Sequence, residues 1–302
     1  MSVLVFGSLN MDLVTRTHRL PQAGETIAGY SFESVPGGKG ANQAVAVARL
    51  GVTVQMRGRV GGDEFGKMLI ESLQLSGVDC DGIRVDETSR SGVAAIAIDD
   101  SGENHIIIVP GANGKVDLSD VERLPLLASK VLLLQLEIPL AIVIAAAQAA
   151  KQAGVTVILD PAPAPTQLPA ELYAAVDILT PNQVEAEQLT GIAIQDEVSA
   201  VQAARQLRQQ SVATVIVKMG AQGALCATAA GEFWVSPFRV RAIDTVAAGD
   251  AFNGGLAAAL AEGLPLPEAC RWAAAAGALA TTVKGAQSAM PTRNELLRLE
   301  DI

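Results

Sequence analysis

Short runs of β-branched residues alternate with longer segments rich in alanine and leucine along most of this chain of 302 residues. The short runs have the composition of buried strands, and the longer segments have the apolar spacing of helices. Strands separated by helices pair in parallel, and a parallel sheet needs helices over both of its faces. The alternation therefore predicts an α/β fold, a three-layer sandwich around a parallel sheet. Strands are predicted at 3–7, 53–60, 131–136, 155–159, 176–180 and 214–218, and helices at 40–50, 64–75, 140–152, 198–209, 250–261, 267–282 and 292–299.

Two segments, 10–36 and 92–114, do not follow this alternation. The first contains two prolines and two glycines but no strong helical pattern, and the second has two apolar runs around a short polar turn. Because neither contains a crossover helix, we expect them to form a small antiparallel β lid beside the main sheet. We therefore expect the whole chain, 1–302, to be a single domain that carries this lid.

The strand predicted at 105–109, with the sequence HIIIV, is apolar on both of its faces. Such a strand needs cover on both sides, because an exposed apolar strand can pair with strands of other chains. Three interpretations of this strand are open: an ordinary surface hairpin, a lid that closes over a substrate, or a contact between two copies of the chain. We favour a homodimer formed through the lid.

The charge balance bears on the class of partner. The formal net charge is −10 and the isoelectric point is near 4.8, so a surface that tracks nucleic-acid phosphates is not expected. An anionic substrate would need a local positive site, because the overall field repels it. The most apolar stretch, 131–150, is interrupted by Gln135, Glu137 and Pro139, so no membrane span is predicted.

The cysteines and the first residues indicate the compartment. Cys80, Cys226 and Cys270 are far apart and odd in number, and no Cys/His cluster has the spacing of a metal site. The N-terminal residues MSVLVFGSLN lack the basic start and the long apolar run of a secretion signal. We therefore expect a soluble, cytoplasmic protein with reduced thiols.

The strongest chemical signal is the segment 243–255, IDTVAAGDAFNGG, which opens a helix. Ala247, Ala248 and Gly249 precede the first turn, where small residues let a ligand approach the free backbone N–H groups. Phosphoryl transfer needs a base for the attacking hydroxyl and donors for the transferring group. Asp250 in the first turn supplies the base, and the helix start supplies the donors. Alternatively, Asp250 is an ordinary acid that favours the helix dipole.

A glycine-rich segment, 36–45, also runs into a helix. Its sequence, PGGKGANQAV, lets the backbone approach a polar ligand, while Lys39 and Asn42 offer donors. A different segment, 61–68, has the GxxxxGK spacing of a phosphate-binding loop. Met68 stands where such a loop needs Ser or Thr for Mg²⁺, so we reject this site and predict a turn and a helix start.

Together these motifs resemble the paired signatures of the ribokinase (PfkB) family of carbohydrate kinases. The signatures are GGKGANQAVAVARLG near the N-terminus and DTVAAGDAFNGG near the C-terminus. GSLNMD, QLE, DPAPAP, TPNQVEAE and KGAQ follow the family's order, so the resemblance covers nearly the whole chain. Most members have Gly where this chain has Ala247, but the ribokinase branch also carries Ala. The resemblance implies the ribokinase-like three-layer fold with a lid.

The resemblance also implies roles for the matching residues. Asp250 matches the catalytic base, and the N–H groups of Ala248 and Gly249 match the anion hole. Sugar-binding positions correspond to Asn10, Asp12, Gly38, Lys39, Asn42, Glu137 and Asp250. Nucleotide-binding positions correspond to Asn182, Glu185, Lys218, Gly220, Gly223 and Gly249, with Glu185 associated with Mg²⁺ and its waters. A K⁺ site corresponds to Asp244, Val246, Ala280, Val283, Gly285 and Ala289.

Several of these residues have a structural alternative. Asn10 and Asp12 suit a turn at a strand end, and Asn182 with Glu185 suits a capping box at a helix start. Asp244 suits a cap of the turn that follows it. Backbone carbonyls supply most of the family's K⁺ ligands, so apolar side chains at the other positions do not exclude the ion.

The implied reaction is the ATP-dependent phosphorylation of D-ribose at its 5-hydroxyl, with ATP, Mg²⁺ and K⁺ bound. One alternative is a kinase of the same family that acts on deoxyribose, a ketose, ketodeoxygluconate or a nucleoside. Another is a non-catalytic sugar- or nucleotide-binding protein, against which the presence of Asp250 argues. The implied partners are a small sugar and ATP, with neither nucleic acid nor membrane.

Overall fold

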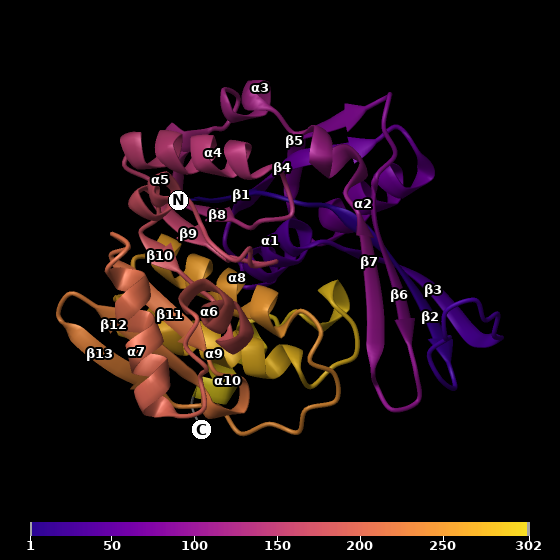
Figure 1. Ribbon diagram of the computed structural model, residues 1–302. Helices are drawn as coiled ribbons and strands as arrows, with labels where there is room; N and C mark the ends of the chain where they lie inside the picture. Colours follow the sequence, from indigo (N-terminus) through magenta and orange to yellow (C-terminus); the bar gives the residue numbers. More distant parts are fainter. Residues whose placement is uncertain (1, 301–302) are drawn as a thin grey trace.

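The computed structural model describes residues 2–300, which form two β-sheets and the helices packed on them (Figure 1). The strands from β11 to β5 of the larger sheet pair in parallel, and β12 and β13 add an antiparallel edge. In spatial order its nine strands are β13 (Gly231–Val235), β12 (Ala224–Thr228), β11 (Thr214–Lys218), β10 (Ile178–Leu179), β9 (Thr156–Leu159), β8 (Ser129–Leu134), β1 (Ser2–Phe6), β4 (Val54–Gly61) and β5 (Asp79–Asp86).

Both faces of this sheet are buried, as the side chains of β1 illustrate. Successive side chains of a strand point to opposite faces. Val3 and Val5 lie in one apolar cluster, Leu4 and Phe6 lie in the other, and all four are fully buried. A parallel sheet needs this double cover, which is why β1 reads as a continuous apolar run. The predicted three-layer α/β sandwich is confirmed.

Helices cover the two faces in two groups (Figure 1). One face carries α1 (Lys39–Arg49), α2 (Glu64–Leu75), α8 (Ala248–Glu262), α9 (Leu266–Ala280) and α10 (Arg293–Glu300). The other carries α3 (Leu118–Val121), α4 (Leu140–Gln152), α5 (Ala170–Ala175), α6 (Gln183–Thr190) and α7 (Glu197–Arg208). Short 3₁₀ helices lie at Gly111–Lys115, Leu126–Ala128, Gly220–Gln222 and Gln287–Ala289. Between residues 2 and 300 no helix is both long enough and apolar enough to cross a membrane.

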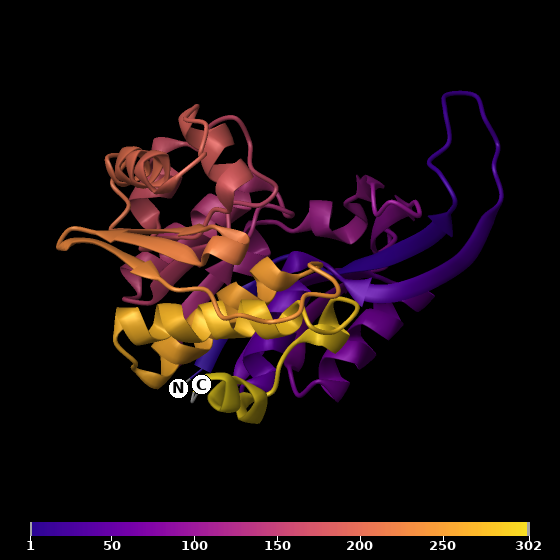
Figure 2. The same cartoon turned by 90° about the horizontal axis from the view of Figure 1, so that it is seen from below.

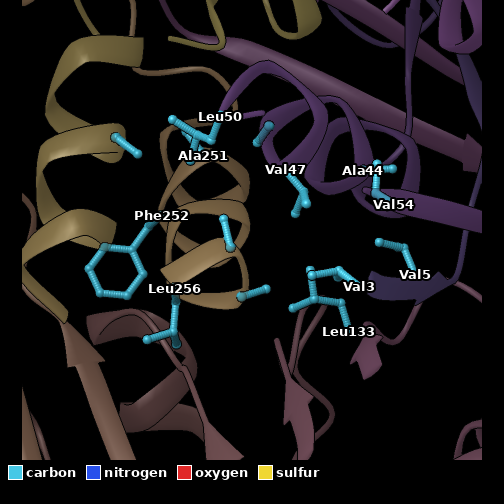
Figure 3. Close-up of a cluster of buried hydrophobic side chains, with 14 of the residues drawn as sticks. Val3, Val5, Ala44, Val47, Leu50, Val54, Leu133, Ala251, Phe252 and Leu256 are labelled. Carbon is cyan, nitrogen blue, oxygen red and sulfur yellow. The ribbon is translucent and has the colours of Figure 1, made fainter. Parts of the chain in front are cut away.

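Helices α1 and α8 pack against each other beside β1 and β8 (Figure 3). Gly254 of α8 lies at their contact, where a Cβ atom would overlap with the Cβ of Ala46 in α1. The absent side chain therefore lets the two helices approach closely. This approach brings Asn42 of α1 within hydrogen-bond distance of Asp250 of α8.

The smaller sheet has the strand order β3 (Gly29–Gly37), β2 (Asn10–Thr17), β6 (Gly92–Ile98) and β7 (Asn104–Val109). The two segments predicted to form the lid supply all four strands, and the sheet projects from the side of the molecule (Figure 2). Both hairpins are antiparallel as expected, but β2 and β6 join them by parallel pairing. The reason is topological, since β2 follows β1 and β6 follows β5, and both leave the main sheet in the same direction.

Several elements were not predicted from the sequence, namely β5, β12, β13, α3, α5 and α6. β12 has the sequence ALCAT, with little β-propensity of its own, and is held by pairing with strands on both sides. The strand predicted at 176–180 shortens to β10, Ile178–Leu179. As predicted, the segment 61–68 is a turn and helix start, because Asp63 accepts a hydrogen bond from the Gly66 N–H and caps α2.

Candidate active site

The predicted site residues gather where parallel strands of the main sheet end, which is the usual place for ligands in such folds. Glu137 lies beyond the end of β8, and Asp160 directly follows β9. Lys218 is the last residue of β11. The N-terminal ends of α1 and α8 face the same region, since the side chains of Asn42 and Asp250 form a hydrogen bond.

Asp250 is buried at the start of α8, and both of its carboxylate oxygens accept hydrogen bonds. Asn42 Nδ2 donates to Oδ2 at 3.0 Å, and Gln43 Nε2 donates to Oδ1 at 3.1 Å. Burial raises the pKa of Asp250 to about 6, although the nearby Lys39 ammonium and these two donors favour the ionised form. A carboxylate with this pKa is an effective proton acceptor near neutral pH.

The backbone at the start of α8 has an unusual conformation. Ala247 adopts the left-handed region, with φ of 57°, which disfavours any residue that has a Cβ atom. The two N–H groups predicted for the anion hole differ in their surroundings. The Ala248 N–H donates to the Thr245 carbonyl at 3.3 Å, whereas no acceptor within residues 2–300 faces the Gly249 N–H. The Gly249 N–H is therefore a free donor at the helix start.

Lys39, the first residue of α1, provides a local positive charge in an acidic protein. Burial lowers the pKa of its ammonium, but nearby carboxylates outweigh burial and the pKa is raised overall. Those carboxylates belong to Asp250, Asp160, Glu137 and Glu185. Lys39 therefore stays charged and meets the expected need for a positive site.

The side chains of Asn10 and Glu137 belong to one hydrogen-bond cluster. Glu137 Oε2 accepts from Ser8 Oγ, from the Lys39 backbone N–H at 3.1 Å and from Asn10 Nδ2 at 3.4 Å. Asn10 Oδ1 accepts from Asn113 Nδ2 at 2.8 Å. Asn113 was not identified from the sequence, where it stood in the lid segment without a motif.

Asp12 lies beside this cluster on β2, with its carboxyl group against the Cα of Gly37. Burial, and after it the charges of Glu137 and Asp250, raise its pKa to about 7. Three carboxyl groups therefore face a common space. Gly38, the residue before α1, has φ of 90°, and a Cβ atom there would lie 2.6 Å from the Asn10 backbone nitrogen. Only glycine fits that position.

A cavity of about 620 Å³ lies on the other side of the α8 start. Its lining includes Lys218, Gly220, Gly223, Ala248 and Gly249. The remaining lining is mostly apolar, with Phe238, Phe252, Ala274, Gly277 and Ala278 among its residues. An apolar cavity that ends at a helix N-terminus and a lysine suits a planar base with a phosphate tail.

Lys218 forms an ion pair with Asp160, a residue to which the sequence analysis assigned no role. Lys218 Nζ lies 2.8 Å from Asp160 Oδ1, and the side chain of Asp160 is almost fully buried. A Cβ atom at Gly249 would lie 3.5 Å from Lys218 Nζ, so the ammonium is next to the helix start. Gln43 Nε2 donates to the other oxygen of Asp160 at 3.0 Å. Asp160 belongs to the motif DPAPAP and Gln43 to GGKGANQ, but the hydrogen bond between them can be seen only in the folded chain.

Asn182 and Glu185 form a capping box, which was the structural alternative to their predicted role in nucleotide binding. Asn182 Oδ1 accepts from the Glu185 N–H at 2.8 Å, and Glu185 Oε2 accepts from the Asn182 N–H at 2.7 Å. Burial raises the pKa of Glu185, while Lys218 favours its ionised form. The carboxyl group therefore caps α6 and also shares the electrostatic field of the site. One such carboxylate, with phosphates and waters, fits the ligand preference of Mg²⁺.

The segments predicted to hold K⁺ are joined through Asp244. Its Oδ1 accepts from the Val246 N–H at 3.1 Å, and its Oδ2 accepts from the Gly285 N–H at 3.0 Å. The turn-capping alternative is therefore present as well. Across residues 2–300 no group of three or more His, Cys, Asp and Glu side chains is arranged to hold a metal ion. The predicted K⁺ site differs from such a group, because backbone carbonyl oxygens would supply most of its ligands.

Fold and site together define a phosphotransferase that acts on a small hydroxyl compound. Residues 1–293 match the model of the pfkB family carbohydrate kinases, and the chain belongs to that family. It is 42% identical over 298 residues to a ribokinase of Haemophilus influenzae, covering 98% of this chain and 97% of that protein. It is 37% identical over 306 residues to a deoxyribokinase of Salmonella typhi, covering 100% of both. A solved structure of Arabidopsis thaliana ribokinase complexed with ribose and ATP is 37% identical, has a TM-score of 0.93, and is matched over 99% of this chain and 98% of that one.

Proposed function

We propose that this carbohydrate kinase transfers the γ-phosphate of ATP to the 5-hydroxyl of D-ribose, giving ADP and ribose 5-phosphate. The observation that carries the proposal is Asp250, a buried carboxylate next to a free helix N-terminus and the Lys39 ammonium. The ribokinases among the relatives match the chain over nearly its full length, and one solved relative was complexed with ribose and ATP.

Asp250 acts as the general base. It accepts the proton of the 5-hydroxyl as that oxygen attacks the γ-phosphorus and the bond to the β-phosphate oxygen breaks. The Gly249 N–H stabilises charge on the transferring group, and the Ala248 N–H joins it if it leaves the Thr245 carbonyl. Lys39 contributes positive charge from the start of α1.

The sugar lies between the lid and the ends of the strands in this proposal. Asn10, Asp12 and Glu137 bind its hydroxyls, together with Lys39, Asn42 and the backbone at Gly38. Asn42 Oδ1 is buried and has no hydrogen-bond partner in the described part of the chain. An unpaired buried acceptor is unfavourable, so it supports a ligand hydroxyl at this point.

The nucleotide occupies the cavity of about 620 Å³, with its base among apolar residues and its phosphates toward Gly249. Lys218, Gly220 and Gly223 line the cavity near the phosphates, and Asn182 and Glu185 lie beside Lys218. Mg²⁺ would neutralise phosphate charge when it is bound, and Glu185 is the carboxylate suited to its water shell. K⁺ would bind carbonyl oxygens near Asp244, Val246, Ala280, Val283, Gly285 and Ala289.

The lid also supports the proposal of a homodimer. Ile106, Ile107, Ile108 and Val109 on β7 are each about half exposed or more, and they point to both faces of the smaller sheet. Tyr30 of β3 is exposed as well. Covering this surface with a second copy would remove apolar side chains from water. A cytoplasmic location belongs to the proposal too, and the three cysteines are all buried free thiols.

The test is a coupled assay of ADP release with a panel of sugars. D-ribose should give the highest kcat/KM. A preference for deoxyribose would favour the alternative supported by the deoxyribokinase relative. Sugar and ATP binding without ADP release would instead indicate a non-catalytic binding protein.

A further inference from the structure

Gln43 lies between two buried carboxylates and has no role in the mechanism so far. Its Nε2 donates to Asp160 Oδ2 at 3.0 Å and to Asp250 Oδ1 at 3.1 Å. The side chain of Gln43 is fully buried in α1. A side-chain amide nitrogen has two hydrogens, so it can serve both carboxylates at once.

The orientation of this amide is fixed by Gln135, which directly follows β8. Gln135 Nε2 donates to Gln43 Oε1 at 2.7 Å, and Gln135 is itself fully buried. Because Gln43 Oε1 accepts this hydrogen bond, Gln43 Nε2 must face the carboxylates. A flipped amide would place an acceptor against Asp160 and Asp250 and would repel both.

Each carboxylate also has a cation of its own. Asp160 forms an ion pair with Lys218 on the nucleotide side, and Asp250 lies in the field of Lys39. Two neighbouring carboxylates without a donor between them disfavour joint ionisation. The charged groups that act on Asp250 directly or through these pairs are Lys39, Asp160, Asp12, Glu137, Glu185 and Lys218.

We propose that Gln43 is a positioning residue for phosphoryl transfer, whose amide keeps Asp250 ionised and aimed while linking it to the Lys218–Asp160 ion pair at the nucleotide cavity. This inference rests on the proposed role of Asp250 as the base. Without Gln43, Asp250 keeps only the donor from Asn42 and faces Asp160 with no hydrogen between them. Its pKa then rises above about 6, and the fraction of ionised base at neutral pH falls.

The experiment compares the pH dependence of kcat in the wild type and in Gln43→Leu, which keeps a similar volume and removes the amide. We expect the acid limb to move up by about one pH unit, because a hydrogen bond to a charged carboxylate is lost. At pH 6 kcat should fall about fivefold, and most of the loss should disappear at pH 8 to 9. The KM for ATP should stay within a few-fold of the wild type.

Gln55→Leu is the matched control, since Gln55 Nε2 donates to Asp79 Oδ2 at 2.8 Å away from the site. Its acid limb should coincide with that of the wild type. Gln135→Met leaves Gln43 in place but frees its amide to turn, and it should give a smaller shift in the same direction. This second variant tests the proposal if Gln43→Leu does not fold.

The carboxyl titration of Asp250 gives a readout that needs no substrate. It can be followed by carbon NMR in aspartate-labelled free protein, with Asp250→Asn to assign the signal. A midpoint raised in Gln43→Leu supports the proposal even if another sugar proves to be the substrate. A wild type that releases no ADP with D-ribose contradicts the proposed function alone. An unchanged Asp250 midpoint, or a loss of kcat that is equal at every pH, overturns the role of Gln43.

Discussion

Asn42 donates a hydrogen bond of 3.0 Å from its side-chain nitrogen to Oδ2 of Asp250, although the two residues are 208 positions apart in the chain. The amide oxygen of Asn42 has no partner among the residues that the structure describes. One amide therefore orients the base and leaves an acceptor for a sugar hydroxyl. Correct placement of the sugar and correct orientation of Asp250 then depend on the same side chain.

Replacing the base is the most direct test of the mechanism. Asp250→Asn keeps the size of the side chain and should lower kcat by about 10²–10⁴-fold, the usual contribution of a general base. In the wild type kcat should rise with pH through about 6, because the carboxylate must be ionised to accept a proton. The variant should lack this rise in an ADP-release assay from pH 5 to 8. Asp79→Asn, outside the site, serves as the control, and a variant with near-normal kcat would contradict the role of Asp250.

Asp12 should affect the sugar more than the nucleotide. Asp12→Ala removes a half-buried carboxyl group from the sugar side and leaves its hydroxyl partner unpaired, at a cost of about 1–3 kcal/mol. The KM for D-ribose should therefore rise by about tenfold or more, while the KM for ATP changes little. Initial rates with each substrate varied in turn measure both constants. A rise confined to ATP would move Asp12 to the nucleotide side.

The raised pKa of Asp12 also predicts how stability depends on pH. Its pKa is about 7 in the folded protein and about 3.8 when unperturbed, so between these values the folded state binds more protons. The free energy of unfolding should therefore fall as pH rises from about 4 to 7. Asp12→Asn removes this penalty and should raise Tm at pH 8 by about 2–4 °C, with no gain at pH 4. Thermal unfolding at the two pH values checks the difference, and an equal effect at both would contradict it.

The contact between α1 and α8 should be as important as the side chains that it positions. Gly254→Ala adds a Cβ atom that overlaps with Ala46, so α8 must move away from α1. Because a misplacement of about 1 Å can lower a rate about 10²-fold, kcat should fall strongly. Gly254→Ala combined with Ala46→Gly removes the closest of the new contacts and should recover part of the activity. A double variant no better than the single one would show that the contact does not position Asp250.

The sequence predicted the sandwich because its strands are continuous apolar runs, as in β1, and its long helices have clear apolar spacing. It did not predict β12, because pairing with neighbouring strands holds that strand more than its own composition does. Asp250 and Asn42 could be named from their motifs. The link from Gln43 to Asp160 could not, because it joins distant segments through buried amides whose orientation only the folded chain defines.

The lid is expected to form the dimer contact. Ile107 on β7 is 67% exposed, and Ile107→Glu would bury a charge in any interface that covers it. Sedimentation should show a dimer for the wild type at micromolar concentration and a shift toward monomer for the variant. Leu127→Glu is a control, since Leu127 is 94% exposed on the short helix Leu126–Ala128, away from the lid. A wild type that sediments only as monomer would contradict the proposal.

Activation by K⁺ is expected because of how Asp244 connects two backbone segments. Its carboxylate accepts from the Val246 N–H and from the Gly285 N–H, so the loop before α8 and the loop after α9 are held together. Carbonyl oxygens of the same two loops are the proposed ligands of the ion. Binding K⁺ between them would order the turn from Asp244 to Ala247 and so fix the direction of the Gly249 N–H.

The effect of the ion should appear in kcat more than in KM, because the Gly249 N–H stabilises charge that is greatest in the transition state. ADP release should be compared in K⁺, in Na⁺ and in a bulky organic cation at equal ionic strength, and K⁺ should give the highest kcat. Asp244→Asn removes the charge and one acceptor for the two N–H groups, so its response to K⁺ should be smaller. Equal rates of the wild type in all three cations would leave Asp244 with only the structural role of joining the two loops.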